Sequence, residues 1–111
     1  MSNQIRMIST ENERLNALTC IFGEFSKAEM KHPEFPVDLI HRSAIVAEES
    51  GELVQACLDN VFDDKSIEDV ITEAAQVGAT VIRFLVSVQR THNKTKLEAM
   101  VQHFKRELKL K

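Results

Sequence analysis

Apolar residues recur at intervals of three and four along four stretches of the chain, and polar or helix-breaking segments separate these stretches. Such spacing predicts amphipathic α-helices, and therefore an all-α fold. Two prolines in the segment 32–36 end the first helix, since proline lacks an amide donor and disfavours helix in the residue before it. Ser66, with acidic residues in the following turn, is a typical N-cap. The predicted helices span about 10–31, 37–60, 67–90 and 95–108, with polar joints at 60–65 and 91–93.

The third predicted helix is polar on one narrow side only. On a wheel with about 100° per residue, its polar side chains fall within a wedge of about 100°. Apolar residues and Gly78 occupy the rest of its circumference. In a chain of four helices, burying such a helix completely usually requires a second subunit. We therefore expect a four-helix bundle that is completed by oligomerisation, as a homodimer or homotetramer.

Composition is consistent with one folded domain over residues 1–111. Hydrophobic residues make up 43% and charged residues 28% of the chain, which is typical of globular proteins and unlike disordered ones. Three Gly, two Pro and six Phe without Tyr or Trp are too few turn and strand formers for a large sheet. This composition supports the all-α interpretation.

The net charge and the lack of targeting signals exclude two classes of partner, nucleic-acid polymers and membranes. A formal net charge of −3 provides no basic surface for a nucleic-acid polymer. No uninterrupted apolar run approaches the roughly 20 residues that cross a bilayer, and the first residues lack the apolar region of a signal peptide. Cys20 and Cys57 lie among apolar residues and are expected to be buried, reduced thiols. We expect a cytoplasmic protein that does not contact membranes.

Acidic residues on the second and third predicted helices form the candidate chemistry. Glu49 and Glu52 are three residues apart and share a helix face, where their charges repel unless a cation is bound. On the third helix Glu73 and Gln76 have the same spacing, with Asp69 one turn earlier. If the two helices are antiparallel, the two sets converge into an oxygen-rich site suited to Mg²⁺ or Mn²⁺. Each pair alone is also compatible with a solvated helix face.

These residues resemble the MazG-like family of all-α nucleoside triphosphate pyrophosphohydrolases. The family pattern is E-x-x-E followed, after a gap, by E-x-x-D on two antiparallel helices. The sequence E-S-G-E at 49–52, with Glu48 before it and Leu53 after it, matches the first half. E-A-A-Q at 73–76 matches the second half except at its last position. The motif-bearing resemblance covers about residues 31–88.

The resemblance implies an enzyme that uses Mg²⁺ to cleave a (d)NTP between the α and β phosphates, which yields (d)NMP and pyrophosphate. House-cleaning of the nucleotide pool is a role of such enzymes. It further implies that Glu49, Glu52 and Glu73 are metal ligands. Glu48 and Glu49 are the catalytic candidates, with Glu48 able to orient the attacking water; the alternative for Glu48 is a solvent-facing residue. The physical chemistry agrees, because carboxylates can bind a triphosphate only through metal ions that bridge them to it.

Gln76 is the departure from the family pattern. Its carboxamide oxygen can coordinate a hard cation but adds no negative charge, so the metal would be held less tightly. Asp69 lies about 20° from Gln76 on the helical wheel and is expected to compensate. If it does, Asp69→Asn should impair turnover as severely as Glu73→Gln.

Two further residues are candidates for substrate binding. His41 lies about two turns before Glu49 and is able to contact a phosphate or a base; the alternative is an ordinary histidine at a helix start. Arg83 lies about two turns beyond Gln76 and is able to pair with phosphate; the alternative is a structural ion pair.

Three other functions compete with the enzyme. A nucleotide-binding or regulatory protein of the same fold, with weak or no catalysis, would follow from the loss of charge at Gln76. A ferritin-like redox bundle needs Glu-x-x-His on two helices, and only 29–32 fits that pattern. A helical interaction protein whose glutamates are merely solvated is the third.

Overall fold

Four α-helices make up the regular structure of the chain. The computed structural model describes residues 3–108, and no strand occurs in that range. The prediction of an all-α chain with four helices is thereby confirmed. The helices are α1 (Glu11–Lys31), α2 (Leu39–Asp63), α3 (Ile67–Thr91) and α4 (Lys94–Glu107).

Side-chain caps determine where the helices begin. Thr10 and Glu13 form a capping box in which each side chain accepts the other's backbone N–H, at 3.1 and 2.8 Å. Ser66 Oγ accepts the amide of Glu68 at 3.0 Å, which confirms the predicted N-cap of α3. Such caps satisfy amide groups that have no partner within the helix.

The end of α2 differs from the prediction, since the helix continues three residues beyond Asn60, to Asp63. Asn60 is nevertheless part of the turn, because its side-chain Nδ2 donates to the carbonyl oxygen of Lys65 at 2.6 Å. Asp64 then ends the helix with a left-handed φ of 55°. The polar residues at 60–65, which predicted a loop, therefore form the solvated last turn of α2 and its C-terminal cap.

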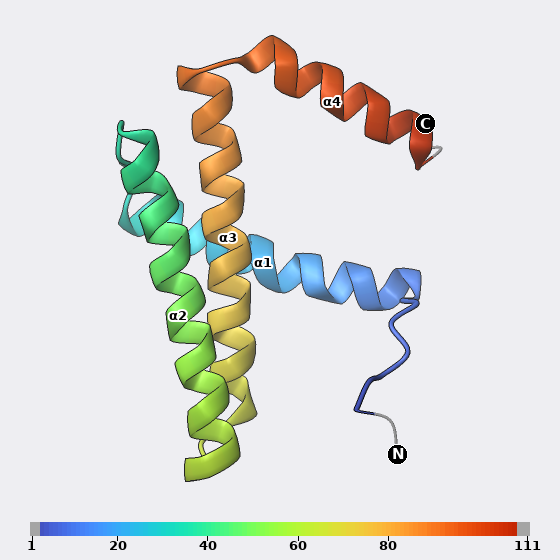
Figure 1. Cartoon of the computed structure of the whole chain (residues 1–111), viewed down its shortest axis with the longest axis vertical. Helices are drawn as coiled ribbons and strands as arrows, with labels where there is room; N and C mark the ends of the chain where they lie inside the picture. Colours follow the sequence, from blue (N-terminus) through green and yellow to red (C-terminus); the bar gives the residue numbers. More distant parts are fainter. Residues whose placement is uncertain (1–2, 109–111) are drawn as a thin grey trace.

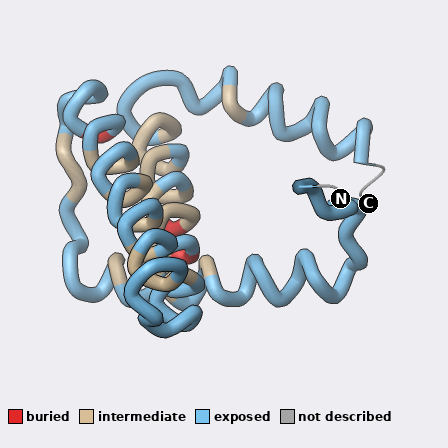
Figure 2. The backbone as a smooth tube through the Cα atoms, turned by 60° about the horizontal axis from the view of Figure 1, so that its bottom comes forward, coloured by how far each residue is buried: buried red, intermediate tan, exposed pale blue. Residues whose placement is uncertain are grey.

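The central element is α3. It runs antiparallel beside α2, while α1 crosses it on another side (Figure 1). From the far end of α3, α4 projects toward the same side as the first half of α1 (Figures 1 and 2). Among the described residues, α1, α2 and α4 each pack on α3 and not on one another.

Very little of this single chain is buried. Of residues 3–108, only Arg42, Ala75 and Ala79 are buried (Figure 2). Large apolar side chains remain exposed on the two projecting helices, which leaves hydrophobic faces without a partner in the monomer. They include Leu15, Leu18 and Phe22 on α1 and Met100, Val101 and Phe104 on α4.

One expectation needs correction. Cys20 and Cys57 are free thiols as predicted, but both are exposed rather than buried, because they lie on helix faces that the other described residues do not cover.

Among the described helices, α3 is long and apolar enough to cross a membrane. Its few polar residues are interspersed, so a search for uninterrupted apolar runs misses it. A helix that packs against three others has the same apolar composition.

Arg42 ties the connection between α1 and α2 to α3. Its Nε and Nη2 donate to the carbonyl oxygens of Pro36 and Val37, both at 2.7 Å, and Nη1 donates to Ser87 Oγ at 3.1 Å. The side chain is 1% exposed, so these bonds replace the hydration that burial removes. Nothing in the sequence pattern marked this arginine as buried.

Gly78 permits the close approach of α1 to α3. A Cβ at this position would lie 2.8 Å from Ile21 Cδ1. Gly78→Ala is expected to lower the free energy of unfolding by roughly 1–2 kcal/mol, because overpacking outweighs the gain in helix propensity. Gly23→Ala is the matched control: it meets nothing within 4 Å and should stabilise by about 0.5–1 kcal/mol. Urea denaturation measures both, and equal stabilisation by the two changes would contradict the observed packing.

Candidate metal centre

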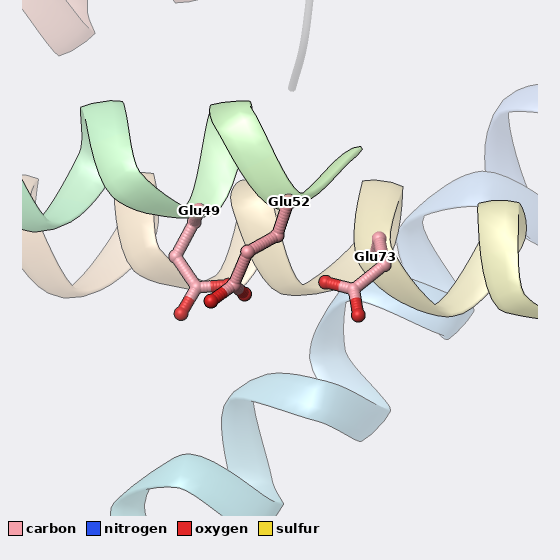
Figure 3. Close-up of side chains that lie close together, drawn as sticks. All are labelled: Glu49, Glu52 and Glu73. Atoms are coloured by element: carbon pink, nitrogen blue, oxygen red, sulfur yellow. The ribbon is translucent and has the colours of Figure 1, made fainter. Parts of the chain in front are cut away.

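Three carboxylates from two helices converge at the middle of the α2–α3 pair. Glu49 and Glu52 extend from adjacent turns of α2, and Glu73 faces them from α3 (Figure 3). One oxygen from each lies within 4.8 Å of the others. Because the two helices are antiparallel, residues 24 positions apart in the sequence meet across the groove between them.

Two oxygen atoms of this cluster are buried without a hydrogen-bond partner. They are Oε2 of Glu49 and Oε2 of Glu73. Buried carboxylate oxygens almost always have a partner, since leaving one unpaired costs free energy. Within residues 3–108, no basic side chain forms an ion pair with any carboxylate of the cluster. A cation or hydrogen-bond donor from outside the described residues, or a proton, would satisfy these oxygens.

The surroundings of the cluster disfavour its negative charge. Burial raises the pKa of Glu49, and the nearby carboxylates of Glu52, Glu73 and Glu48 raise it further. Burial also raises the pKa of Glu73, with additional contributions from Glu52, Asp69 and Glu24. Both pKa values are raised for the same reason: several carboxylates lie close together where little water solvates their charge.

A divalent cation fits this donor set. Mg²⁺ binds oxygen ligands at about 2.1 Å, so ligands on one ion lie roughly 3–4 Å apart, close to the spacing within the cluster. Carboxylates are the protein ligands that hard cations prefer, and the two unpartnered oxygens have free lone pairs. Glu49, Glu52 and Glu73 therefore form a group able to hold Mg²⁺ or Mn²⁺.

A cavity of about 430 Å³ extends from the cluster toward α1. Its size is in the range of small-ligand sites. Its lining includes Glu24, Glu49 and Gln76. The basic side chains of Lys27, Lys31 and Arg83, together with His32 and the ring of Phe35, also line it.

Arg83 is held in the cavity wall by backbone atoms. Its Nη2 donates to the carbonyl oxygens of His32 and Glu34, and its guanidinium group lies over the Phe35 ring, 4.9 Å from the centroid. In the described part of the chain it makes no ion pair, which was the alternative to a phosphate contact. The structure thus fixes a cation beside the cavity without neutralising it.

Asp69 and Gln76 lie on different sides of the cluster. Asp69 lines a separate hollow of about 300 Å³ together with Glu52 and Glu73. Its carboxylate is not among the three that converge, although its charge acts on Glu73. Gln76 lines the larger cavity with Glu49.

Glu48 and His41 lie outside both hollows. Glu48 is exposed on α2 beside Glu49. His41 is exposed in the first turn of α2, where its amide donates to Asp38 at 2.8 Å. Of the residues singled out from the sequence, the structure brings together the three glutamates and places Gln76 and Arg83 along the adjoining cavity.

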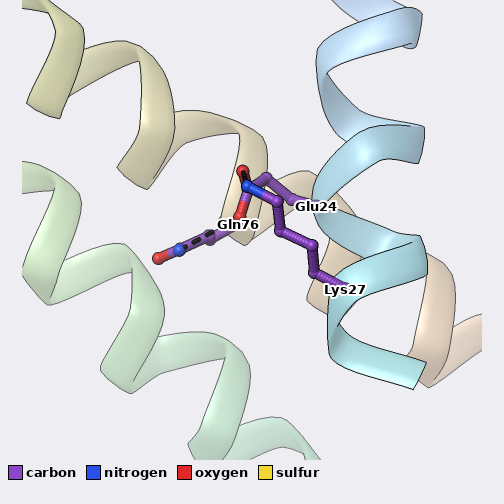
Figure 4. A network of polar contacts seen from close by, with 3 residues as sticks. All are labelled: Glu24, Lys27 and Gln76. Atoms are coloured by element: carbon purple, nitrogen blue, oxygen red, sulfur yellow. Dashed lines mark hydrogen bonds and ion pairs between the residues drawn. The ribbon is translucent and has the colours of Figure 1, made fainter. Parts of the chain in front are cut away.

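Glu24 is a cavity residue that the sequence pattern did not indicate. It extends from α1, accepts a hydrogen bond from Gln76 Nε2 at 3.2 Å, and pairs with Lys27 at 3.3 Å (Figure 4). The contact joins residues 52 positions apart. Only the crossing of α1 over α3 reveals it, because α1 contains four glutamates and its apolar spacing does not single out Glu24.

Known proteins add nothing to this description. Neither protein families, curated proteins nor solved structures give a match to the chain. The cluster, the cavity and the residues that line them are therefore the features that indicate a function.

Proposed function

We propose that this chain is a cytoplasmic, Mg²⁺-dependent nucleoside triphosphate pyrophosphohydrolase of the MazG-like type. It would convert a (d)NTP to (d)NMP and pyrophosphate. The observation that carries the proposal is the convergence of three carboxylates within 4.8 Å, two of them with buried oxygens that lack a partner. In a structural ion-pair network, basic side chains would occupy those positions.

Each part of the cavity has a separate role in this proposal. Glu49, Glu52 and Glu73 hold the metal, which when bound neutralises phosphate charge and activates water. Arg83 binds a phosphate oxygen, because its guanidinium group is already fixed at the wall by backbone carbonyls. Glu48 is next to the cluster and remains our candidate for orienting the water that attacks.

The lysines of α1 complete the phosphate-binding side. Lys27 and Lys31 line the same cavity as Arg83, so three cations share this cavity with Glu49 of the acidic cluster. A triphosphate chelated to a divalent ion needs carboxylates at the ion and cations at the remaining phosphate oxygens. The lining of the cavity provides both.

We further propose that a second copy of the chain covers the exposed helix faces. A compact 12.6-kDa protein exposes about 6200 Å², whereas this chain exposes 9270 Å². The radius of gyration is 16.4 Å, against about 13 Å for a compact domain of this length. The excess of about 3000 Å² per chain corresponds to about 6000 Å² for a pair of chains, at the upper end of what obligate subunit interfaces bury.

This assembly is testable with a charge placed on each projecting helix. Leu18→Glu on α1 and Phe104→Glu on α4 are expected to reduce the mass in solution toward that of one chain, because a buried carboxylate opposes association. Lys105→Glu, at an exposed polar position of α4, is the control and should leave the mass unchanged. Light scattering measures the masses, and a monomeric wild-type protein at micromolar concentration would refute the assembly.

The reaction is tested with a panel of ribo- and deoxyribonucleoside triphosphates in Mg²⁺ or Mn²⁺. We expect pyrophosphate release from at least one nucleotide and none in EDTA. The same panel ranks the substrates, since the shape of the cavity decides base and sugar preference.

A second candidate is a nucleotide-binding protein with little catalysis. It is favoured by Gln76, whose amide is engaged by Glu24 and which contributes no charge to a metal. Tight nucleotide binding without pyrophosphate release from any member of the panel would support this candidate against the enzyme.

A further inference from the structure

Gln76 occupies the position at which the sequence departs from the E-x-x-D pattern, and its side chain is hydrogen-bonded to a glutamate of another helix. The side-chain Nε2 donates to Glu24 Oε1 at 3.2 Å, across the contact between α3 and α1 (Figure 4). Both residues line the cavity that also contains Glu49. The carboxylate of Glu24 on α1 is therefore hydrogen-bonded to the residue that stands where the pattern has an aspartate.

The hydrogen bond determines how Gln76 is oriented. A carboxamide has its nitrogen and oxygen on the same carbon, and only the nitrogen can donate to a carboxylate. The oxygen is therefore turned away from Glu24 and α1, as Figure 4 shows. An aspartate at this position would instead place two negative charges in contact, so Gln76 and Glu24 are chemically matched.

The charge of Glu24 is free to act on the cluster. Its side chain is 16% exposed, and it lines the same cavity as Glu49. Lys27 pairs with it at 3.3 Å, but that lysine is 70% exposed. Such a pair is weak and exchanges readily with solvent, so it screens Glu24 only partly.

We propose that Glu24 takes the place of the carboxylate missing at position 76: it orients the oxygen of Gln76 toward the metal and adds its own negative charge to the site. This inference rests on the metal centre of the proposed function. Glu24 is a positioning residue of this metal centre. The number of acidic groups equals that of the E-x-x-D pattern, because a carboxylate on α1 replaces the one missing from α3. Asp69 is then not needed for compensation.

The test exchanges the two residues. Glu24→Gln is expected to weaken Mn²⁺ binding by about tenfold or more, the usual effect of removing a group that supports a metal ligand. The double variant Glu24→Gln/Gln76→Glu restores the charge on the opposite helix and keeps a hydrogen bond between the two positions. We expect it to bind Mn²⁺ within about threefold of the wild-type protein. Glu29→Gln is the matched control, since it removes one exposed carboxylate from the same helix and should bind as wild type.

Mn²⁺ titration followed by electron paramagnetic resonance measures these affinities without any nucleotide. Circular dichroism verifies that each variant remains helical, and where the double variant does not fold, the difference between Glu24→Gln and Glu29→Gln decides. Equal binding by wild type and Glu24→Gln overturns the inference, as does a folded double variant that fails to recover. Absence of Mn²⁺ binding in the wild-type protein overturns it together with the metal centre. Metal binding that responds as expected, without hydrolysis of any triphosphate, refutes the enzyme but leaves the role of Glu24 supported.

Discussion

Glu73→Gln is expected to lower metal-dependent pyrophosphate release by roughly 100-fold or more while raising the melting temperature of the metal-free protein. Activity falls because one of three converging carboxylates is lost from the metal centre. Stability rises because the change removes a charge that burial and three neighbouring carboxylates disfavour. Glu49→Gln should behave in the same way.

Opposite changes in activity and stability distinguish a functional cluster from a structural one, since functional sites often keep groups that destabilise the fold. Steady-state assays and thermal melts in EDTA provide the two measurements. Glu98→Gln, at an exposed position of α4, is the control and should change neither quantity. A Glu73→Gln protein that melts at a lower temperature would contradict the account, and unchanged activity would remove Glu73 from the site.

Metal-free stability is expected to fall as the pH rises through the raised pKa values of Glu49 and Glu73. In the unfolded chain both carboxyls titrate near their ordinary value of 4.5, whereas in the folded protein they hold their protons to higher pH. Above pH 4.5 the folded state therefore binds more protons than the unfolded state, and the free energy of unfolding decreases with pH. Below that value both states are protonated and the penalty disappears.

Mg²⁺ or Mn²⁺ should reverse this trend. The metal binds ionised carboxylates, so its stabilising effect appears only as the pH rises past the titration of the cluster. At a concentration 100 times the dissociation constant, a ligand specific to the folded state adds about 2.7 kcal/mol. Thermal melts between about pH 4 and 8, with metal and with EDTA, should diverge toward higher pH. Parallel curves would show that the cluster does not bind the metal.

The helices could be predicted because their signals are local. Thr10, Ser66 and Asn93 lie at helix starts and cap them with their own side chains. The apolar spacing within each stretch then follows from burial on one face. The local signal was ambiguous at Asn60, because this residue lies inside α2 while its side chain donates a hydrogen bond to Lys65 in the following turn.

The glutamate cluster could also be located from the sequence, because antiparallel neighbours with a short turn bring particular positions together. Glu49, Glu52 and Glu73 satisfy this geometry through the α2–α3 hairpin alone. No such rule places α1, which reaches α3 after a proline-containing connection. Glu24, whose contact with Gln76 depends on that crossing, was therefore missed. Arg42 was missed because two of its three hydrogen bonds go to backbone carbonyls of the α1–α2 connection.

Phosphorus NMR of the wild-type protein with a nucleoside triphosphate and Mg²⁺ tests the central claim most directly, because it identifies which phosphate bond is broken. The account predicts that resonances of a nucleoside monophosphate and pyrophosphate appear together, and that EDTA or Glu73→Gln abolishes both. Release of inorganic phosphate with a nucleoside diphosphate, or an unchanged spectrum across the nucleotide panel, would contradict it.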